Sequence, residues 1–155
     1  MTVLPKLYYA AAVVQAAPIS YVDQTLLRVI NFAAKMVYGL RKYDHATQSK
    51  RQLGWLDPVI ELKYRTQLMA YKLFLEGSSI GSLAMEEARR SRRLNGVVNF
   101  KLPSFSTDAS RRAFSYRAPM LLNNACQSLS LDCQSPIHLK NFKSLLRSLY
   151  DNLFA

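Results

Sequence analysis

LGWLDPVIELKYRTQLMAYKLFLEG, from Leu53 to Gly77, carries the signals of one long helix in the middle of the chain. Asp57 can accept hydrogen bonds from the free amides of a first helical turn, and Pro58 follows where a missing N–H costs nothing. Gly77 tolerates the left-handed backbone that often ends a helix. These signals predict a central helix over residues 58–76.

The apolar side chains of this predicted helix occupy much of its circumference, which is typical of a helix inside a core. One series follows helical spacing and a second flanks it: Ile60, Tyr64, Leu68, Tyr71 and Leu75, then Leu62, Met69 and Leu73. We therefore expect Leu68 in the middle of the core and Lys63 at the exposed edge. Trp55, the only tryptophan, stands just before the cap and is expected to fold back on the first turn in a structural role.

Composition limits the class of protein. The chain has 155 residues, of which 50% are hydrophobic and 20% charged, so it is long enough for one real core and is not expected to be disordered. We expect two parts, residues 1–77 and 78–155, packed as one unit. Twenty-one lysines and arginines against ten acids give a net charge of +11, which attracts polyanions. Nucleic acid is the first candidate partner, followed by anionic lipid and RNA-rich assemblies.

Two further helices are predicted before the central one. Residues 5–17 form a short, nearly unpolar helix that Pro18 ends. Ser20 caps a second helix that runs to Gly39 and packs on the first as an antiparallel pair. The buried positions of this second helix are expected at Val22, Leu26, Ile30 (or Val29), Ala33 and Val37. A basic connector follows, with a short helix from Thr47.

The second half is predicted to be mainly helical as well. One helix carries the charged run EEARRSRR, and the alternating segment VVNFKL after it predicts at most a short β-hairpin near residues 97–106. Asp108 or Ser110 caps a further helix that Pro119 must kink or interrupt. The final helix covers residues 136–153. The sequence therefore predicts a mainly α fold, a helical bundle.

No set of residues has the spacing of a catalytic site. The acidic residues are scattered rather than paired as two-metal chemistry requires, and the glycines form no phosphate-binding loop. His45 and His138 lie far apart and are expected to have surface or capping roles. Cys126 and Cys133 are too few for a zinc site and are interpreted as free thiols in a reducing compartment. We expect no enzyme activity, no metal and no cofactor.

The apolar run from Leu7 to Ala17 is too short to cross a membrane, so no membrane span is expected. The run loosely resembles a leader peptide, although Pro5 and two tyrosines make a poor hydrophobic region. Secretion or import into an organelle therefore stays an alternative. The expected location is inside the cell, in the nucleus or the cytoplasm.

Positive charge is concentrated in one stretch of the second half. Between Arg89 and Arg117 there are eight lysines or arginines and a single acid, Asp108. Most of these cations are candidates for contact with phosphates: Arg89, Arg90, Arg92, Arg93, Arg111, Arg112 and Arg117. The aromatic residues between them either stack on unpaired bases or fill the core: Phe100, Phe105, Phe114 and Tyr116.

Several short motifs occur in a characteristic order along the chain. The first half carries VLPKLYY (3–9), LLRVINFAAKMV (26–37), RKYDH (41–45), LGWL (53–56) and YK (71–72). The second half carries RAFSYRAP (112–119) and FKSLL (142–146). In this order, over nearly the whole chain, the motifs resemble the C-terminal part of reverse transcriptases from non-LTR retrotransposons, the LINE-type elements.

The resemblance implies a helical thumb and tail without the polymerase palm and its metal-binding motif. In that family the thumb holds the template–primer duplex. The resemblance carries this role to Lys35, Arg41, Lys42, Lys50 and Arg51. The Trp-Asn of the family's LWNSLP segment is replaced around Asn123, so the local packing is expected to differ there.

Two functions of different classes fit these observations. The first is a retroelement-derived, non-enzymatic module that binds the backbone of RNA or DNA without reading its sequence. The alternative is a structural subunit of a larger protein or ribonucleoprotein assembly, in which another chain covers the apolar N-terminal helix.

Overall fold

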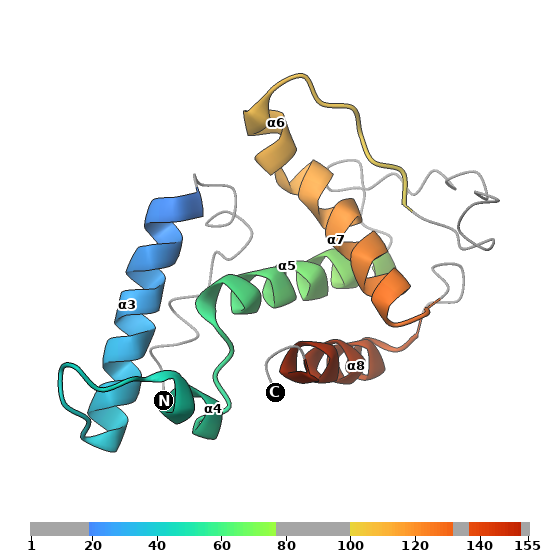
Figure 1. Ribbon diagram of the computed structural model, residues 1–155. Coiled ribbons are helices and arrows are strands. Elements are labelled where there is room, and N and C mark those ends of the chain that lie inside the picture. Colours follow the sequence, from blue (N-terminus) through green and yellow to red (C-terminus); the bar gives the residue numbers. More distant parts are fainter. Residues whose placement is uncertain (1–18, 77–99, 132–136, 153–155) are drawn as a thin grey trace.

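The computed structural model describes residues 19–76, 100–131 and 137–152, and in these residues the chain is mainly α-helical, as predicted (Figure 1). The helices are α3 (Ile19–Tyr38), α4 (Thr47–Gln52), α5 (Pro58–Leu75), α6 (Asp108–Arg112), α7 (Phe114–Ser128) and α8 (Leu139–Asn152). α5 lies in the centre of the molecule and contacts α3, α7 and α8.

The start of the central helix is confirmed. The Asp57 carboxylate accepts a hydrogen bond from the backbone N–H of Val59 at 3.2 Å, and Pro58 is the first helical residue. The helix ends at Leu75, one residue earlier than predicted, with Glu76 as its C-cap. Gly77, the predicted stop, lies outside the described residues.

The buried face of α5 differs from the predicted one. Leu68 is only partly buried and packs at the margin of the core, while Leu62 and Ala70 are among the least exposed residues of the helix. The buried face also contains Thr66 and Gln67, which an apolar pattern does not count. Thr66 is compatible with burial because its hydroxyl donates to the carbonyl of Leu62 at 2.8 Å. Placing Leu68 at the centre was therefore wrong.

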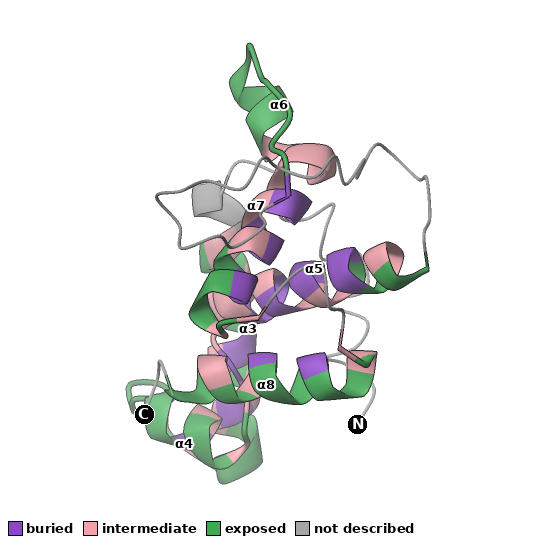
Figure 2. Ribbon diagram, turned by 90° about the vertical axis from the view of Figure 1, so that its right-hand side faces the viewer, coloured by how far each residue is buried: buried purple, intermediate pink, exposed green. Residues whose placement is uncertain are grey.

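α5, α7 and α8 form what we call the core bundle. The ring of Tyr71 in α5 stacks on Phe142 in α8 with centroids 3.8 Å apart, and its hydroxyl donates to the carbonyl of Ile137 at 2.7 Å. The amide of Gln67 donates to the carbonyl of Leu121 in α7 and accepts from the hydroxyl of Tyr150 in α8. Figure 2 shows buried residues along α5 and on the sides of α7 and α8.

The helix break predicted at Pro119 lies six residues earlier in the structure, at Ala113. Thr107, rather than Asp108 or Ser110, caps α6 by accepting a hydrogen bond from the N–H of Ser110 at 3.2 Å. Ala113 then adopts an extended backbone and separates α6 from α7. Pro119 lies inside α7 and is fully buried, so the burial of its ring offsets part of the cost of its missing N–H.

α3 ends as predicted, at a glycine with positive φ. Gly39 has φ +62°, its N–H donates to the carbonyl of Met36, and the N–H of Leu40 donates to the carbonyl of Lys35 at 2.9 Å. This pair of bonds is a Schellman motif. The helix begins at Ile19, which places Ser20 in the first turn rather than at the cap.

The buried side of α3 contains Ile30 and Ala34, which are almost fully buried. The choice between Ile30 and Val29 is thereby resolved, because Val29 is exposed. Val37 was predicted to be buried and is 61% exposed; Tyr38 is exposed as well, so the buried side of α3 ends before its last residues.

Phe100 is held by a side chain of α7. The amide of Asn123 accepts from the N–H of Phe100 at 2.7 Å and donates to its carbonyl at 2.9 Å, as a neighbouring strand would. Residues 100–107 form no sheet, while residues 97–99 of the predicted hairpin lie outside the described residues. The predicted helices over 5–17 and 78–94 lie outside them too.

The final helix begins three residues later than predicted. His138 caps it, because its ring Nδ1 accepts a hydrogen bond from the N–H of Lys140 at 3.2 Å and its carbonyl accepts from Asn141 and Phe142. The capping role expected of this histidine is confirmed. Residues 136 and 153, the predicted bounds, lie outside the described residues.

Candidate nucleic-acid interface

Basic residues gather where α3 turns into α4. The ammonium of Lys35 donates to the carbonyl of Lys42 at 2.6 Å and so ties the loop to the end of α3. The carboxylate of Asp44 accepts from the N–H of Arg41 at 2.7 Å and closes the turn. Arg41 and Lys42 are both exposed, and the ring of Tyr43 between Lys42 and Asp44 is 87% exposed.

A groove of about 800 Å³ runs along this end of α3 and is called the α3 groove below. It is lined by Arg28, Asn31, Phe32, Lys35, Met36, Gly39, Leu40 and Lys42. Three of these described lining residues are cations and none is an acid. The groove therefore presents positive charge beside an apolar wall.

The apolar wall of the α3 groove faces away from the core bundle. Phe32 is 65% exposed and Met36 is 68% exposed, whereas Ile30 and Ala34 on the other side of the helix are buried. The sequence analysis missed Arg28, Asn31, Phe32 and Met36 as site residues. The spacing of four residues from Arg28 to Phe32 and to Met36 was the signal that they share a face with Lys35.

Lys50 and Arg51 lie in the last turn of α4. They follow the groove residues in the sequence but are not among the described lining residues. Lys50 is half-buried and Arg51 is exposed. Their backbone carbonyls accept the two hydrogen bonds of a second Schellman motif at Gly54. Their positive charge also suits a helix C-terminus.

Arg111 and Arg112 belong to a second basic site on α6, at the opposite end of the molecule from α4 (Figures 1 and 2). The guanidinium of Arg111 lies 4.4 Å from the ring centre of Phe105, and Nε of Arg112 donates to the carbonyl of Asp108. Phe105 also contacts the ring of Tyr116 edge-on. Arg111 and Arg112 therefore lie in a site separate from the predicted cations near α4.

Arg117 lies apart from both basic sites, half-buried in α7. Burial lowers the pKa of its guanidinium, and the carboxylate of Asp23 in α3 partly opposes this shift. Burial and the repulsion of Asp57 raise the pKa of Asp23, while Lys63 and Arg117 lower it. Arg117 thus belongs to a group of charges between α3, α5 and α7.

The remaining predicted cations, Arg89, Arg90, Arg92 and Arg93, lie outside the described residues. Of the aromatic residues predicted with them, Phe100 is buried in the core cluster and Phe114 packs against it. Phe105 is the exposed member of this set. The two predicted roles of the aromatic residues were core packing and base stacking. Phe100 fills the core, and Phe105 remains available to a ligand.

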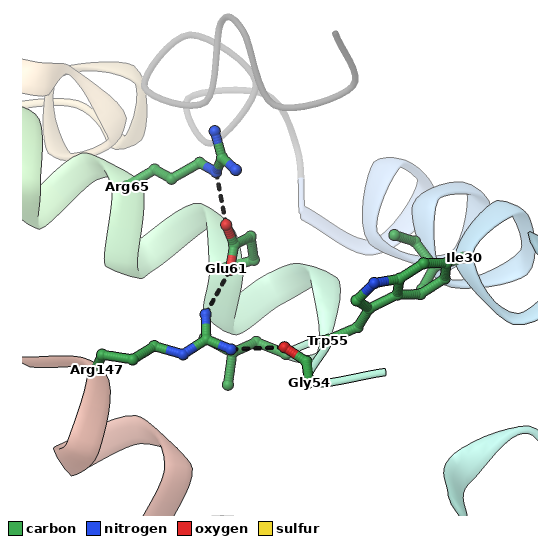
Figure 3. A pocket seen from close by; sticks show the side chains of 7 residues that line it. Ile30, Gly54, Trp55, Glu61, Arg65 and Arg147 are labelled. Carbon is green, nitrogen blue, oxygen red and sulfur yellow. Dashed lines mark hydrogen bonds and ion pairs between the residues drawn. The ribbon is translucent and has the colours of Figure 1, made fainter. Parts of the chain in front are cut away.

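A smaller pocket, of about 170 Å³, lies between the α4–α5 turn and α8 and is lined in part by Ile30, Trp55 and Glu61 (Figure 3). The carboxylate of Glu61 contacts Nε of Arg65 at 2.7 Å and Nη1 of Arg147 at 3.6 Å. Nη2 of Arg147 also donates to the carbonyl of Gly54 at 2.6 Å. Glu61, Arg65 and Arg147 pair with one another and are called the Glu61 cluster below. Through Arg147 this cluster connects α8 to the α4–α5 turn.

In the part of the chain that the structure describes, no group of three or more histidines, cysteines or acids is arranged to hold a metal ion. Cys126 is buried, and Cys133 lies outside the described residues. None of the described helices is both long enough and apolar enough for a membrane span. Comparisons with protein families, curated proteins and solved structures found no match to this chain.

Proposed function

We propose that this protein is a non-enzymatic module that binds RNA or DNA through the phosphate backbone. The observation that supports this function best is the α3 groove, where Arg28, Lys35 and Lys42 line one surface without an acid among the described lining residues. A net charge of +11 adds long-range attraction for a polyanion. Binding would take place inside the cell, where such ligands are abundant.

The proposal agrees with the role that the resemblance to a retrotransposon thumb implies. In that interpretation the cations near the end of α3 and in α4 hold the backbone of a nucleic acid: Lys35, Arg41, Lys42, Lys50 and Arg51. The site at Arg111 and Arg112 would be a second contact on a longer ligand, because it lies at the other end of the molecule.

The experiment is a salt titration of binding to single-stranded and duplex RNA and DNA. Phosphate contact predicts that log K falls linearly with log salt, by about 0.9 for each contact on duplex DNA and about 0.7 on a single strand. Arg41→Gln and Lys42→Gln should each reduce this slope by about one contact. Lys140→Gln and Lys143→Gln, exposed on α8, are the matched controls. A flat salt response, or no binding at low salt, would contradict the proposal.

The alternative function, a structural subunit of a larger protein or ribonucleoprotein assembly, is favoured by one observation. Val29, Phe32, Met36 and Val37 expose apolar surface on a single helix, and such surface is common at protein contacts. Sedimentation of the pure protein tests this function. A soluble monomer that binds nucleic acid tightly would leave it without support.

A further inference from the structure

One residue of the α3 groove has a property that phosphate contact does not use. The ring of Phe32 lines the groove and is 65% exposed. Asn31 lines the groove too, but its side-chain Oδ1 is buried, so a ligand in the groove does not reach that atom.

The groove also has the charge and size for a nucleotide. Arg28 precedes Phe32 in the sequence and Lys42 follows it, and both cations line the groove with the ring. The volume of the groove, about 800 Å³, lies in the range of small-molecule sites. The loop that carries Lys42 continues into Tyr43, a second aromatic residue that is 87% exposed. Exposed rings alternating with cations are the usual surface for unpaired nucleic acid.

We infer that the α3 groove binds an unpaired base of a single strand. The base stacks on Phe32, and the flanking phosphates contact Arg28 and Lys42. This inference rests on the proposed function and specifies the form of nucleic acid. Because every base has a flat face, the site tolerates many sequences.

A duplex fits this groove less well than a single strand. Inside a duplex, both faces of each base are covered by neighbouring bases, so Phe32 has no face to stack on. A protein surface that covers Phe32 and Met36 with apolar side chains would leave Arg28, Lys35 and Lys42 without counter-charges. An unpaired strand supplies both the flat apolar face and the negative charge.

The test measures affinity of the full chain for a short RNA or DNA strand without self-complementarity and for its duplex. Phe32→Leu keeps an apolar side chain but removes the ring, and should weaken single-strand binding by about 5- to 150-fold. The duplex affinity and the salt slope should stay unchanged. Phe32→Tyr should restore most of the binding, because the ring returns.

Leu145→Ala is the control, since Leu145 is another exposed apolar residue, on α8 and in neither basic site. It should leave single-strand binding unchanged. Thermal melts should show that Phe32→Leu is as stable as the unsubstituted protein, because the ring is mostly exposed.

Several outcomes would overturn the inference. If Phe32→Leu changes neither affinity, or lowers both equally, the inference is wrong, while salt-dependent binding would still support the proposed function. If Phe32→Leu instead converts an oligomer into a monomer without affecting single-strand binding, the groove is a protein contact. If the unsubstituted protein binds no nucleic acid, the proposed function and this inference both fail.

Discussion

The core bundle and the α3–α4 unit, residues 19–52, differ in how they use large apolar side chains. In the core bundle, Phe142 is fully buried and stacked on Tyr71, and both rings belong to a continuous cluster. In the α3–α4 unit, Phe32 and Met36 lie mostly in solvent beside cations. Burial of apolar area drives folding, so the first set contributes to stability. The second set contributes little to it and is available to a ligand.

The two regions also differ in their polar contacts. Gln67 bonds to both neighbouring helices of the core bundle, whereas the loop of the α3–α4 unit is closed by Lys35 and Asp44, which lie close to their partners in the chain. The comparison therefore suggests a stable bundle that carries a separate, charged ligand surface. Four predictions can break or sharpen it.

The largest effect is expected for Phe142→Ala. Removal of a fully buried ring that stacks on Tyr71 leaves a cavity and should lower the free energy of unfolding by about 3 to 5 kcal/mol. Phe32→Ala should change it by less than about 0.5 kcal/mol. Urea unfolding of both variants measures the difference. Equal losses would show that the two regions do not differ in the way described.

Arg147→Ala tests the connection between the regions. The substitution removes the contacts of Arg147 with Glu61, Gly54 and Asp151, and should lower the free energy of unfolding by about 1 to 2 kcal/mol. Amide hydrogen exchange should increase more in α4 than in α7, because the Glu61 cluster holds the α4–α5 turn against α8. Exchange that increases equally in α4 and α7 would contradict a local connection.

The C-terminal ends of α3 and α7 allow matched substitutions in the two regions. Gly39 and Ser130 occupy the same position of a Schellman motif, with φ +62° and +51°. Ser130→Gly should raise the free energy of unfolding by about 0.5 to 1 kcal/mol, because the left-handed backbone is costly for a residue with a Cβ. Gly39→Ala should lower it by about 1 kcal/mol, although the new Cβ would meet no atom within 4 Å. Thermal melts with the same sign for both variants would refute this account.

The smallest effect is expected for Asp23→Asn and depends on pH. Burial and Asp57 raise the pKa of Asp23, so the folded state binds the proton more tightly than the unfolded state does. Stability due to this group is therefore lost as the pH rises through the raised pKa. The variant should melt slightly higher than the unsubstituted protein at neutral pH, and the gap should close below about pH 4. A gap that is independent of pH would contradict the shift.

The sequence predicted some helix ends correctly, whereas the caps predicted at Ser20 and at Asp108 or Ser110 were wrong. Asp57, Pro58 and Gly39 act through local backbone bonds, and all three behave as predicted. Burial depends on distant partners instead. Leu68 lies at the margin and Gln67 in the interior because α7 and α8 contact a side of α5 that apolar spacing alone does not identify.

The candidate site was predicted from charge and only partly from geometry. Lys35 and Lys42, two of the residues proposed as nucleic-acid contacts, line the α3 groove, but Phe32 and Asn31 were not identified. Phe32 was overlooked because an apolar residue on an amphipathic helix is normally read as buried. The distance between the α3 groove and Arg111 was not predictable either, because it follows from tertiary packing.

Gln67 has a consequence for the uniqueness of the fold. Apolar contacts are not directional, so α7 and α8 could slide along α5 by a residue and recover much of their buried area. The two bonds of Gln67, to the Leu121 carbonyl and to the Tyr150 hydroxyl, allow one register of the three helices. Any other register would leave a buried amide unpaired, at a cost of about 1 to 3 kcal/mol. Gln67, together with the bond from Tyr71 to the Ile137 carbonyl, thus favours the observed alignment over others.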